Sequence, residues 1–309
     1  MAPADRGSRD PPAPPGSLRL RILSALVLAP IAIAAAWFGS PWLAIVAAIA
    51  GAVMAWEWAG LCRAGGVGRA GANGAEASGP GANGVGASGV VLIGAVLAAI
   101  GAAVAAEAGG GIAPAIGVSL LGAAIVFGAA RMAQDREPRW LALGALWIAV
   151  PCVLLLWLAR IDGAGRSTVL WIFAIVWATD IGAYAIGRRL GGPLLWPRWS
   201  PRKTWAGLIG GAGCAALAGW GTARVLMYID PLGISSVLPL VLVSAGLAIV
   251  EQFGDLAESV AKRRFGVKDS SGLIPGHGGL LDRLDGLLAV VPAVALLTLI
   301  GGGSVVTWR

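Results

Sequence analysis

Residues 140–159 read WLALGALWIAVPCVLLLWLA, twenty consecutive residues without a single Asp, Glu, Lys or Arg. A transmembrane α-helix needs about 20 predominantly apolar residues to cross the hydrocarbon layer of a bilayer. The rest of the chain has the same character, because its mean hydropathy is +0.80, 57% of its 309 residues are hydrophobic and only 13% are charged. This composition excludes an ordinary soluble globular domain and indicates an integral membrane protein.

Eight further segments are apolar enough to approach the length of a membrane span, on both sides of residues 140–159. We therefore predict an all-α fold, a polytopic membrane bundle of about nine transmembrane helices. The approximate predicted spans are 22–38, 42–61, 90–106, 112–130, 140–159, 168–187, 205–228, 235–259 and 286–303.

The distribution of Lys and Arg over the predicted loops sets the orientation of these spans. Alternate loops, starting with the N-terminus, hold 19 of the 23 basic residues, and the opposite side holds four. By the positive-inside rule the N-terminus and the loops around 188–203 and 262–283 are cytoplasmic. The sequence thus predicts a multi-pass protein of the inner (cell) membrane.

Composition also divides the chain into regions. Residues 1–21 are rich in Pro and Arg and are expected to form a disordered cytoplasmic tail. Residues 64–90 contain the near-duplicate GANGAEASGP and GANGVGASGV, which is typical of a flexible linker. We expect an N-terminal transmembrane region over 22–159 and a C-terminal transmembrane catalytic region over 160–309.

The stretch 251–285, EQFGDLAESVAKRRFGVKDSSGLIPGHGGLLDRLD, carries 11 of the 39 charges of the chain. Carboxylates at the edge of hydrocarbon need a compensating cation, lysine or ligand. If the eighth span continues as a helix, the spacing of four, three and four residues puts Glu251, Asp255, Glu258 and Lys262 on one face. This face is either a polar stripe satisfied by neighbouring helices or part of a functional site.

Downstream of that face lies a glycine-rich loop followed by two acids. The glycines within 276–279 allow a positive φ and a close approach of backbone amides to a ligand. His277, the only histidine, is either a ligand or a helix-capping or core polar residue. Asp282 and Asp285 are three residues apart and can share one helix face. Oxygen ligands with at most one histidine favour Mg²⁺ over zinc.

A second charged cluster lies in the preceding cytoplasmic loop. It follows Asp180, which lies inside the sixth predicted span, and it includes Arg188, Arg189, Arg198, Arg202 and Lys203. A basic cluster at headgroup level attracts the phosphate of a nucleotide or an anionic lipid. The alternative is the ordinary positive-inside signal. The polar residues Ser200 and Thr204 beside Lys203 favour a ligand.

These two clusters carry a family resemblance. The C-terminal positions resemble the signature of the phosphatidate cytidylyltransferases, the CDP-diacylglycerol synthases; they are Ser259, Lys262, Arg263, Lys268, Asp269, Pro275, His277, Gly278, Gly279, Asp282, Arg283 and Asp285. Similar stretches lie upstream at Thr179, Asp180, Gly182, Ala183, Tyr184, Gly187 and Arg188, at Ser200, Pro201, Lys203, Thr204, Trp205 and Gly207, and briefly at Trp56, Glu57 and Trp58. The chain departs from the family pattern at Ala206, where the family generally carries glutamate, and at Arg202 and Ala261.

The resemblance implies the reaction of CTP with phosphatidic acid to give CDP-diacylglycerol and pyrophosphate, at a site facing the cytoplasm among membrane lipids. It implies that Asp255 and Asp282 bind Mg²⁺, with Asp285 and Glu258 around them or on a second cation. The other residues that it implies for catalysis are Lys262 and His277, and those for phosphate binding are Ser200, Lys203, Thr204, Ser259, Arg263, Lys268 and Arg283. It also implies a homodimer, and no nucleic-acid partner is expected.

Two other classes of function remain open on the sequence. An ion-coupled transporter also combines intramembrane acids with glycine-rich loops, although no inverted repeat of hydropathy supports one here. A different membrane lipid phosphotransferase, one that releases CMP, is the second alternative. Such enzymes resemble one compact pattern that combines DG, AR, G and spaced aspartates on two helices, and this combination is not found here.

Overall fold

The computed structural model describes residues 17–67, 86–106, 111–229, 236–274 and 278–308. Within these ranges the chain forms nine α-helices, a two-stranded sheet and a short 3₁₀ helix at Val305–Thr307, which confirms the all-α prediction. The helices are α1 (Ser17–Phe38), α2 (Trp42–Val67), α3 (Ala87–Ala105), α4 (Ala113–Met132), α5 (Pro138–Ala159), α6 (Gly165–Leu190), α7 (Trp205–Ile229), α8 (Leu238–Arg264) and α9 (Leu281–Ile300).

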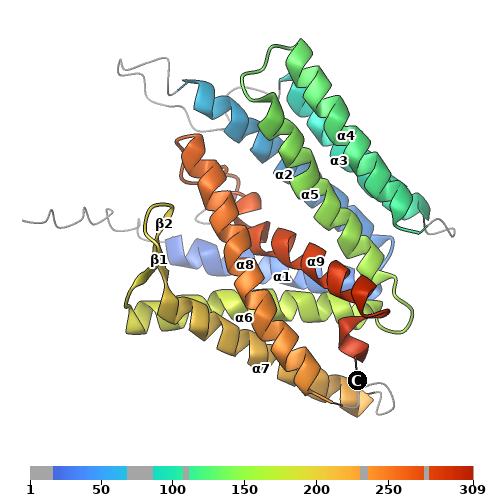
Figure 1. Cartoon of the computed structure of the whole chain (residues 1–309), viewed down its shortest axis with the longest axis vertical. Helices are drawn as coiled ribbons and strands as arrows, with labels where there is room; N and C mark the ends of the chain where they lie inside the picture. Colours follow the sequence, from blue (N-terminus) through green and yellow to red (C-terminus); the bar gives the residue numbers. More distant parts are fainter. Residues whose placement is uncertain (1–16, 68–85, 107–110, 230–235, 275–277, 309) are drawn as a thin grey trace, which may run out of the picture.

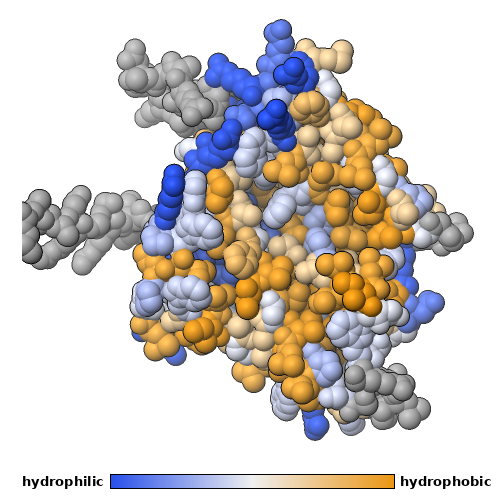
Figure 2. All heavy atoms as spheres, in the orientation of Figure 1, coloured by the Kyte–Doolittle hydropathy of each residue, from blue (hydrophilic) through white to orange (hydrophobic). Residues whose placement is uncertain are grey.

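Of the described helices, seven are long and apolar enough to cross a membrane, namely α2 to α6, α8 and α9. The chain is thus a multi-pass membrane protein. The large apolar side chains that remain exposed include Leu120 and Ile125 on α4 and Ile209 and Leu217 on α7. In Figure 2 apolar atoms cover the broad middle of the visible face, while hydrophilic atoms gather along one upper edge. Such a surface is suited to contact with lipid.

The helices pack into two connected hydrophobic clusters. The first is formed mainly by α2, α3, α4 and α5, and the second mainly by α6, α7, α8 and α9. Figure 1 shows α3 and α4 side by side at one end of the molecule, and α9 between α5 and α8. Helices α5 and α9 contribute buried residues to both clusters, so α9 is held on two sides.

Several helix ends differ from the predicted spans. Helix α1 begins at Ser17 rather than 22, and α2 continues to Val67, so the first residues of the predicted linker are helical. The last residues of the linker are helical as well, because α3 begins at Ala87. Residues 68–85 of that linker, and residues 1–16 of the predicted tail, lie outside the described residues. Helix α8 continues to Arg264 and α9 begins at Leu281, five residues ahead of the predicted start. Asp282 and Asp285 therefore lie on a helix.

A small β-hairpin, which the sequence did not predict, connects α6 with α7. Its strands, β1 (Leu194–Trp196) and β2 (Ser200–Thr204), pair antiparallel, with Leu194 opposite Thr204 and Trp196 opposite Ser200. Gly191 and Gly192 precede it with φ of 62° and 94°, a region that favours glycine. Helix α7 then begins directly, because Thr204 Oγ1 accepts a hydrogen bond of 3.1 Å from the amide of Gly207.

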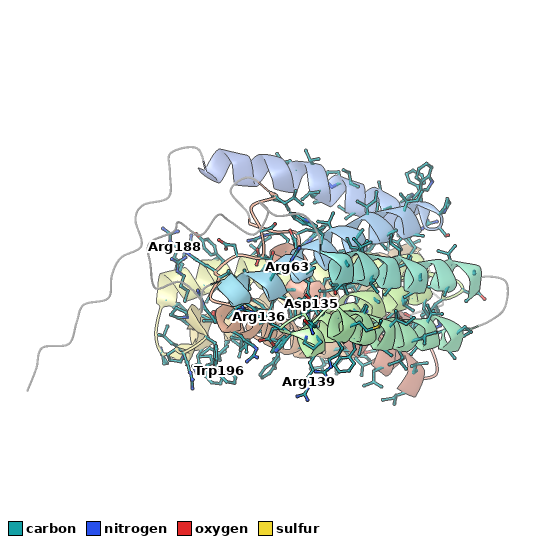
Figure 3. The ribbon with its side chains drawn as sticks, turned by 90° about the horizontal axis from the view of Figure 1, so that it is seen from above. Arg63, Asp135, Arg136, Arg139, Arg188 and Trp196 are labelled. Atoms are coloured by element: carbon teal, nitrogen blue, oxygen red, sulfur yellow. The ribbon has the colours of Figure 1, made fainter. Side chains whose placement is uncertain are left out.

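The charged loops of the described chain lie toward a common side. Figure 3 shows Arg63, Arg136, Arg139 and Arg188 toward the same end of the helices, together with Trp196 of the hairpin. These residues lie in or beside three connections between helices that the charge distribution assigned to the cytoplasm. The shared end agrees with that assignment, and the compartment itself stays a prediction.

Candidate functional site

The polar face of α8 forms one side of the candidate site. Because α8 is one continuous helix from Leu238 to Arg264, Glu251, Asp255, Glu258 and Lys262 lie along the same face, as their spacing predicted. Glu251 and Glu258 are buried, at 2% and 1% exposure, although both carry carboxylates. The ammonium of Lys262 lies 3.4 Å from Oε1 of Glu258, one turn earlier on the helix.

Helix α9 supplies the opposite side through Asp282 in its first turn. Oδ1 of Asp282 accepts a hydrogen bond of 2.6 Å from Lys262, which joins α9 to α8. Oδ2 accepts hydrogen bonds from the amide and the hydroxyl of Ser270, both at 2.9 Å, and from the amide of Gly279 at 2.8 Å. The carboxylate is therefore fixed in position, and its negative charge lies at the N-terminal end of α9, where the helix dipole favours it.

Two glycines allow these helices to approach closely beside the carboxylates. A Cβ at Gly254 of α8 would lie 2.6 Å from Cβ of Ala289 and 2.9 Å from the carbonyl oxygen of Asp285. A Cβ at Gly286 of α9 would lie 2.6 Å from Cγ of Glu251. A methyl group at Gly254 would require the helices to separate, and one at Gly286 would displace the Glu251 side chain, so the two glycines allow the close approach of the acidic faces.

The hairpin contributes a second lysine. Nζ of Lys203, on β2, lies 2.5 Å from Oδ2 of Asp255 and 3.4 Å from the carbonyl oxygen of Gln252. The other carboxylate oxygen of Asp255 accepts a longer hydrogen bond, 3.4 Å, from the hydroxyl of Ser259. Asp180 of α6 lies within electrostatic range of Asp255 and Lys203. The site is thus formed by α6, β2, α8 and α9, with two lysines among the acids.

The loop between α8 and α9 is held by a residue from α2. Glu57 is 1% exposed, and its two carboxylate oxygens accept hydrogen bonds from the hydroxyls of Ser270 (3.3 Å) and Ser271 (2.6 Å). They also accept hydrogen bonds from the amides of Leu280 (2.9 Å) and Leu281 (2.7 Å). The first amides of a helix have no partner within it, and Leu280 at the N-cap has no capping side chain. Glu57 therefore caps α9 from another helix.

An apolar pocket adjoins the charged site. It has a volume of about 120 Å³ and lies between α1, α2, α5, α6 and α9, with Ala47, Met54, Leu155, Trp177 and Leu287 among its lining residues. Arg283 is the one charged residue of the lining. Because Arg283 directly follows Asp282 in the first turn of α9, the pocket and the acidic site are neighbours on two faces of that turn.

Comparison with known proteins agrees with this arrangement of apolar helices around a charged site. The model of the Cytidylyltransferase family matches residues 19–300, most of the chain. The chain belongs to this family. The match includes the N-terminal half as well as the charged stretch, so Glu57 and the α8–α9 site both lie within the family region.

Individual relatives match about half of the chain. A phosphatidate cytidylyltransferase of Brucella suis is 48% identical over 162 residues, which cover 52% of this chain and 57% of the relative. One from Staphylococcus haemolyticus is 44% identical over 133 residues, 43% of this chain and 49% of the relative. One from Bacillus subtilis is 35% identical over 161 residues, 52% and 58% of the two chains. The chain thus spans about half the length of the curated relatives it matches.

The structure of this cytidylyltransferase family member brings many of the predicted site residues together. Asp255, Asp282, Lys262 and Lys203 form two lysine–carboxylate pairs, and Ser259 and Asp285 lie beside them. Arg263 and Lys268 are exposed near the C-terminal end of α8. His277 lies outside the described residues. The binding and catalytic roles predicted for these residues, and for Ser200, Thr204 and Arg283, stay predictions.

Glu57, Ser270 and Ser271 are parts of the site that the sequence did not assign to it. Glu57 showed two signals. It lies in the short stretch Trp56, Glu57 and Trp58 that resembles the family, and it is the sole acid in the apolar α2, where a lone acid indicates function. Its partners could not be found, because Ser270 and Leu281 are more than 200 positions away. The two serines carried no signal beyond their place between two helices.

The donor atoms of the site fit a hard cation in chemical type. Glu258 is buried, and within the described residues its carboxylate has only the 3.4 Å contact with the Lys262 ammonium and the neighbouring Asp285 side chain, although buried polar atoms normally have closer partners. Carboxylate oxygens are the ligands that Mg²⁺ prefers. Among the described residues, no three Asp, Glu, His or Cys side chains are already grouped as a metal-ligand set. In this structure the carboxylates of Asp255 and Asp282 form ion pairs with Lys203 and Lys262.

Proposed function

We propose that this protein transfers CMP from CTP to phosphatidic acid, giving CDP-diacylglycerol and pyrophosphate for phospholipid synthesis. The observation that carries the proposal is the pair of lysine–carboxylate contacts, Lys203 with Asp255 and Lys262 with Asp282, beside an apolar pocket. Membership of the family and the identity of the relatives as phosphatidate cytidylyltransferases support the same reaction. A nucleotide can reach the charged residues from water, and a lipid can reach the adjoining apolar pocket from the bilayer.

The proposed chemistry needs little proton transfer. A phosphate monoester of a lipid has a second pKa near ~6 and is largely dianionic at neutral pH, so its oxygen is already a nucleophile. This oxygen attacks the α-phosphorus of CTP, a new P–O bond forms, and the bond from the α-phosphorus to the bridging oxygen of the β-phosphate breaks. Pyrophosphate leaves with that electron pair. The main task of the protein is to hold two anions together and to neutralise their charge.

Asp255 and Asp282 are the proposed Mg²⁺ ligands, with Glu258 and Asp285 as outer ligands or ligands of a second cation. When bound, the metal screens the charge of the triphosphate and of the leaving pyrophosphate. For Asp255 and Asp282 to bind it, their lysine partners must turn away. Lys203 and Lys262 are then available to phosphate oxygens, so each lysine exchanges a carboxylate for a phosphate.

The remaining predicted contacts surround this centre. Arg263 and Lys268 meet the triphosphate from the exposed end of α8, and Ser200 and Ser259 donate hydroxyl hydrogen bonds to phosphate. Thr204 already accepts a hydrogen bond from the Gly207 amide, so it also fixes the junction of the hairpin with α7. We also retain a catalytic role for His277. A homodimer, which the family resemblance implies, is part of the same proposal.

The pocket supplies the proposed lipid subsite. Its apolar lining suits part of an acyl chain, and Arg283 at its charged side suits the single phosphate of the lipid. The lipid phosphate would then lie next to Asp282, within reach of a nucleotide held by α8 and β2.

The test is a product assay on the purified protein in lipid nanodiscs, with CTP labelled at the α-phosphate and phosphatidic acid. Formation of labelled CDP-diacylglycerol with an equal amount of pyrophosphate is the expected result, and EDTA should abolish it. The variants Asp255→Ala and Asp282→Ala should retain less than about 1% of the turnover while inserting normally in membranes. Release of CMP would indicate the phosphotransferase, and ion flux in proteoliposomes without turnover would indicate a transporter.

A further inference from the structure

Glu57 is a buried acid with four donor groups of the described chain within hydrogen-bond distance, and all four lie between α8 and the start of α9. The donors are two serine hydroxyls and two backbone amides between positions 270 and 281, and the carboxylate is 1% exposed. A carboxylate in an apolar helix costs free energy unless it is fully hydrogen-bonded. The segment that satisfies Glu57 is the one that leads into Asp282.

We propose that Glu57 is a positioning residue, which holds Ser270, Ser271 and the start of α9 so that the carboxylate of Asp282 points at the cation site. This inference rests on the proposed function, because Asp282 is there a Mg²⁺ ligand. Glu57 touches neither substrate in this proposal. It acts through these contacts, in the way that outer hydrogen bonds orient metal ligands in other proteins.

Ser270 is the link between the two carboxylates. Its hydroxyl lies 3.3 Å from Oε2 of Glu57 and 2.9 Å from Oδ2 of Asp282, and its single proton can serve one of them at a time. Its amide donates to the same Oδ2 of Asp282 at 2.9 Å. If Ser270 moved because Glu57 no longer held it, its amide and its hydroxyl would both lose their contact with Oδ2 of Asp282. Two of the contacts that orient Asp282 would then be lost.

The space around this link is filled. A Cβ at Gly279 would overlap Oγ of Ser270 and would lie 2.7 Å from Oε1 of Glu57. A Cβ at Gly278, where φ is 84°, would lie 2.9 Å from Oδ2 of Asp282. The two glycines thus let the backbone fold tightly between the acids, so a displacement of Glu57 passes directly to Asp282.

Helix α2 is itself anchored next to Glu57. Nε1 of Trp58 donates a hydrogen bond of 2.7 Å to the carbonyl oxygen of Trp140 on α5. The Trp58 ring fills the space that a side chain at Gly144 would need. The Trp140 ring in turn contacts the edge of Phe265, at the end of α8, with ring centroids 5.6 Å apart. The packing of these aromatic side chains fixes the part of α2 that carries Glu57, as the role of a positioning residue requires.

A carboxylate is needed because all four partners are donors. An amide in the same place offers one oxygen, and in either orientation its NH₂ group would face the backbone amide of Leu280 or Leu281, which can only donate. The variant Glu57→Gln keeps the size of the side chain and removes this match. We expect the Mg²⁺ concentration for half-maximal activity to rise about 10- to 100-fold, whereas KM for CTP at saturating Mg²⁺ stays close to wild type.

The experiment measures this Mg²⁺ dependence and, separately, Mn²⁺ binding by electron paramagnetic resonance on the purified protein without substrate. Glu57→Gln should weaken Mn²⁺ binding by a similar factor. Ser119→Ala is the matched control, because it removes another buried hydroxyl, which donates only to the Ala115 carbonyl in its own helix α4. It should leave both readouts unchanged. Glu57→Asp, one methylene shorter, should fall between Glu57→Gln and wild type.

Ser270→Ala provides an independent variant if Glu57→Gln does not fold. It should shift the Mg²⁺ dependence in the same direction, and the double variant should be no worse than Glu57→Gln alone, because both act through one link. A wild-type Mg²⁺ and Mn²⁺ response in either single variant overturns the inference. So does lost activity with unchanged Mn²⁺ affinity, which is a purely structural effect. A wild-type protein that forms no CDP-lipid refutes the proposed function instead, and the Mn²⁺ measurement still decides the role of Glu57.

Discussion

Lys262 on α8 and Asp282 on α9 are joined by a 2.6 Å contact at which both side chains are largely buried, with exposures of 11% and 5%. The same lysine lies 3.4 Å from the carboxylate of Glu258. One ammonium thus serves two acids on two helices. Removal of a partner from a buried ion pair costs more than the pair itself contributes, because the remaining charge is left without compensation.

The variant Lys262→Met should therefore lose both stability and turnover. We expect a loss of about 3 kcal/mol in the free energy of unfolding, measured by thermal denaturation in detergent. The control is Arg264→Met on the same helix, whose ion pair with Glu137 is longer, 3.3 Å, and more exposed. It should cost at most about 1 kcal/mol. Equal losses in the two variants would contradict the importance of burial at Lys262.

Gly254→Ala should separate α8 from α9 at the site. The new methyl group would lie 2.6 Å from Cβ of Ala289, so the helices must move apart, at a cost of about 1–3 kcal/mol. We expect turnover to fall at least about 10-fold, since small displacements of reacting groups are costly. Gly246→Ala on the same helix has open space around it and should behave as wild type. The assay is CDP-lipid formation at equal amounts of protein in membranes.

Lys203→Met should act on catalysis more than on folding. Its contact with Asp255 is partly exposed, at 16% and 32%, so little stability depends on it. As a proposed phosphate partner it should contribute about 100-fold to kcat. Arg198→Met, which removes a cation stacked on Trp199 in the same hairpin, serves as the comparison. If the two variants have the same kcat, Lys203 has no special place in the reaction.

Ala47→Leu should narrow the apolar pocket and discriminate between the substrates. KM for long-chain phosphatidic acid should rise several-fold, and KM for CTP should stay unchanged, because Ala47 lines the apolar pocket and neither lysine does. Ala115→Leu places the same side chain in a second cavity of similar volume, about 130 Å³, between α3, α4 and α5. An equal effect of both substitutions would show that general packing, not the lipid subsite, is responsible.

The polar face of α8 was predictable because helical periodicity is local. Glu251, Asp255, Glu258 and Lys262 needed only a continuous helix to align, and apolar residues on both sides favoured one. The end of α8 also follows a local rule. The amide of Gly266, with φ of 73°, donates to the carbonyl of Arg263, and that of Val267 to the carbonyl of Lys262, a glycine-terminated helix end.

The early start of α9 and the role of Glu57 could not be predicted in the same way. The predicted span began at 286 because the preceding residues are charged, yet Asp282 can lie in the first turn of a helix once Lys262 and Ser270 compensate it. Those partners come from tertiary packing. Residues 194–204 formed a hairpin for a similar reason, since Lys203 fastens it to α8.

The distance along the chain between Glu57 and its partners also bears on biosynthesis. Its hydrogen bonds span 213 to 224 residues, so at 5–20 residues per second the ribosome needs roughly 10 to 45 s after Glu57 to reach them. During that interval α2 leaves the translocon with an acid that has none of its final donors. Completion of the site is therefore among the last events of assembly, and a nascent chain that ends before α9 should be a preferred substrate of membrane quality-control proteases.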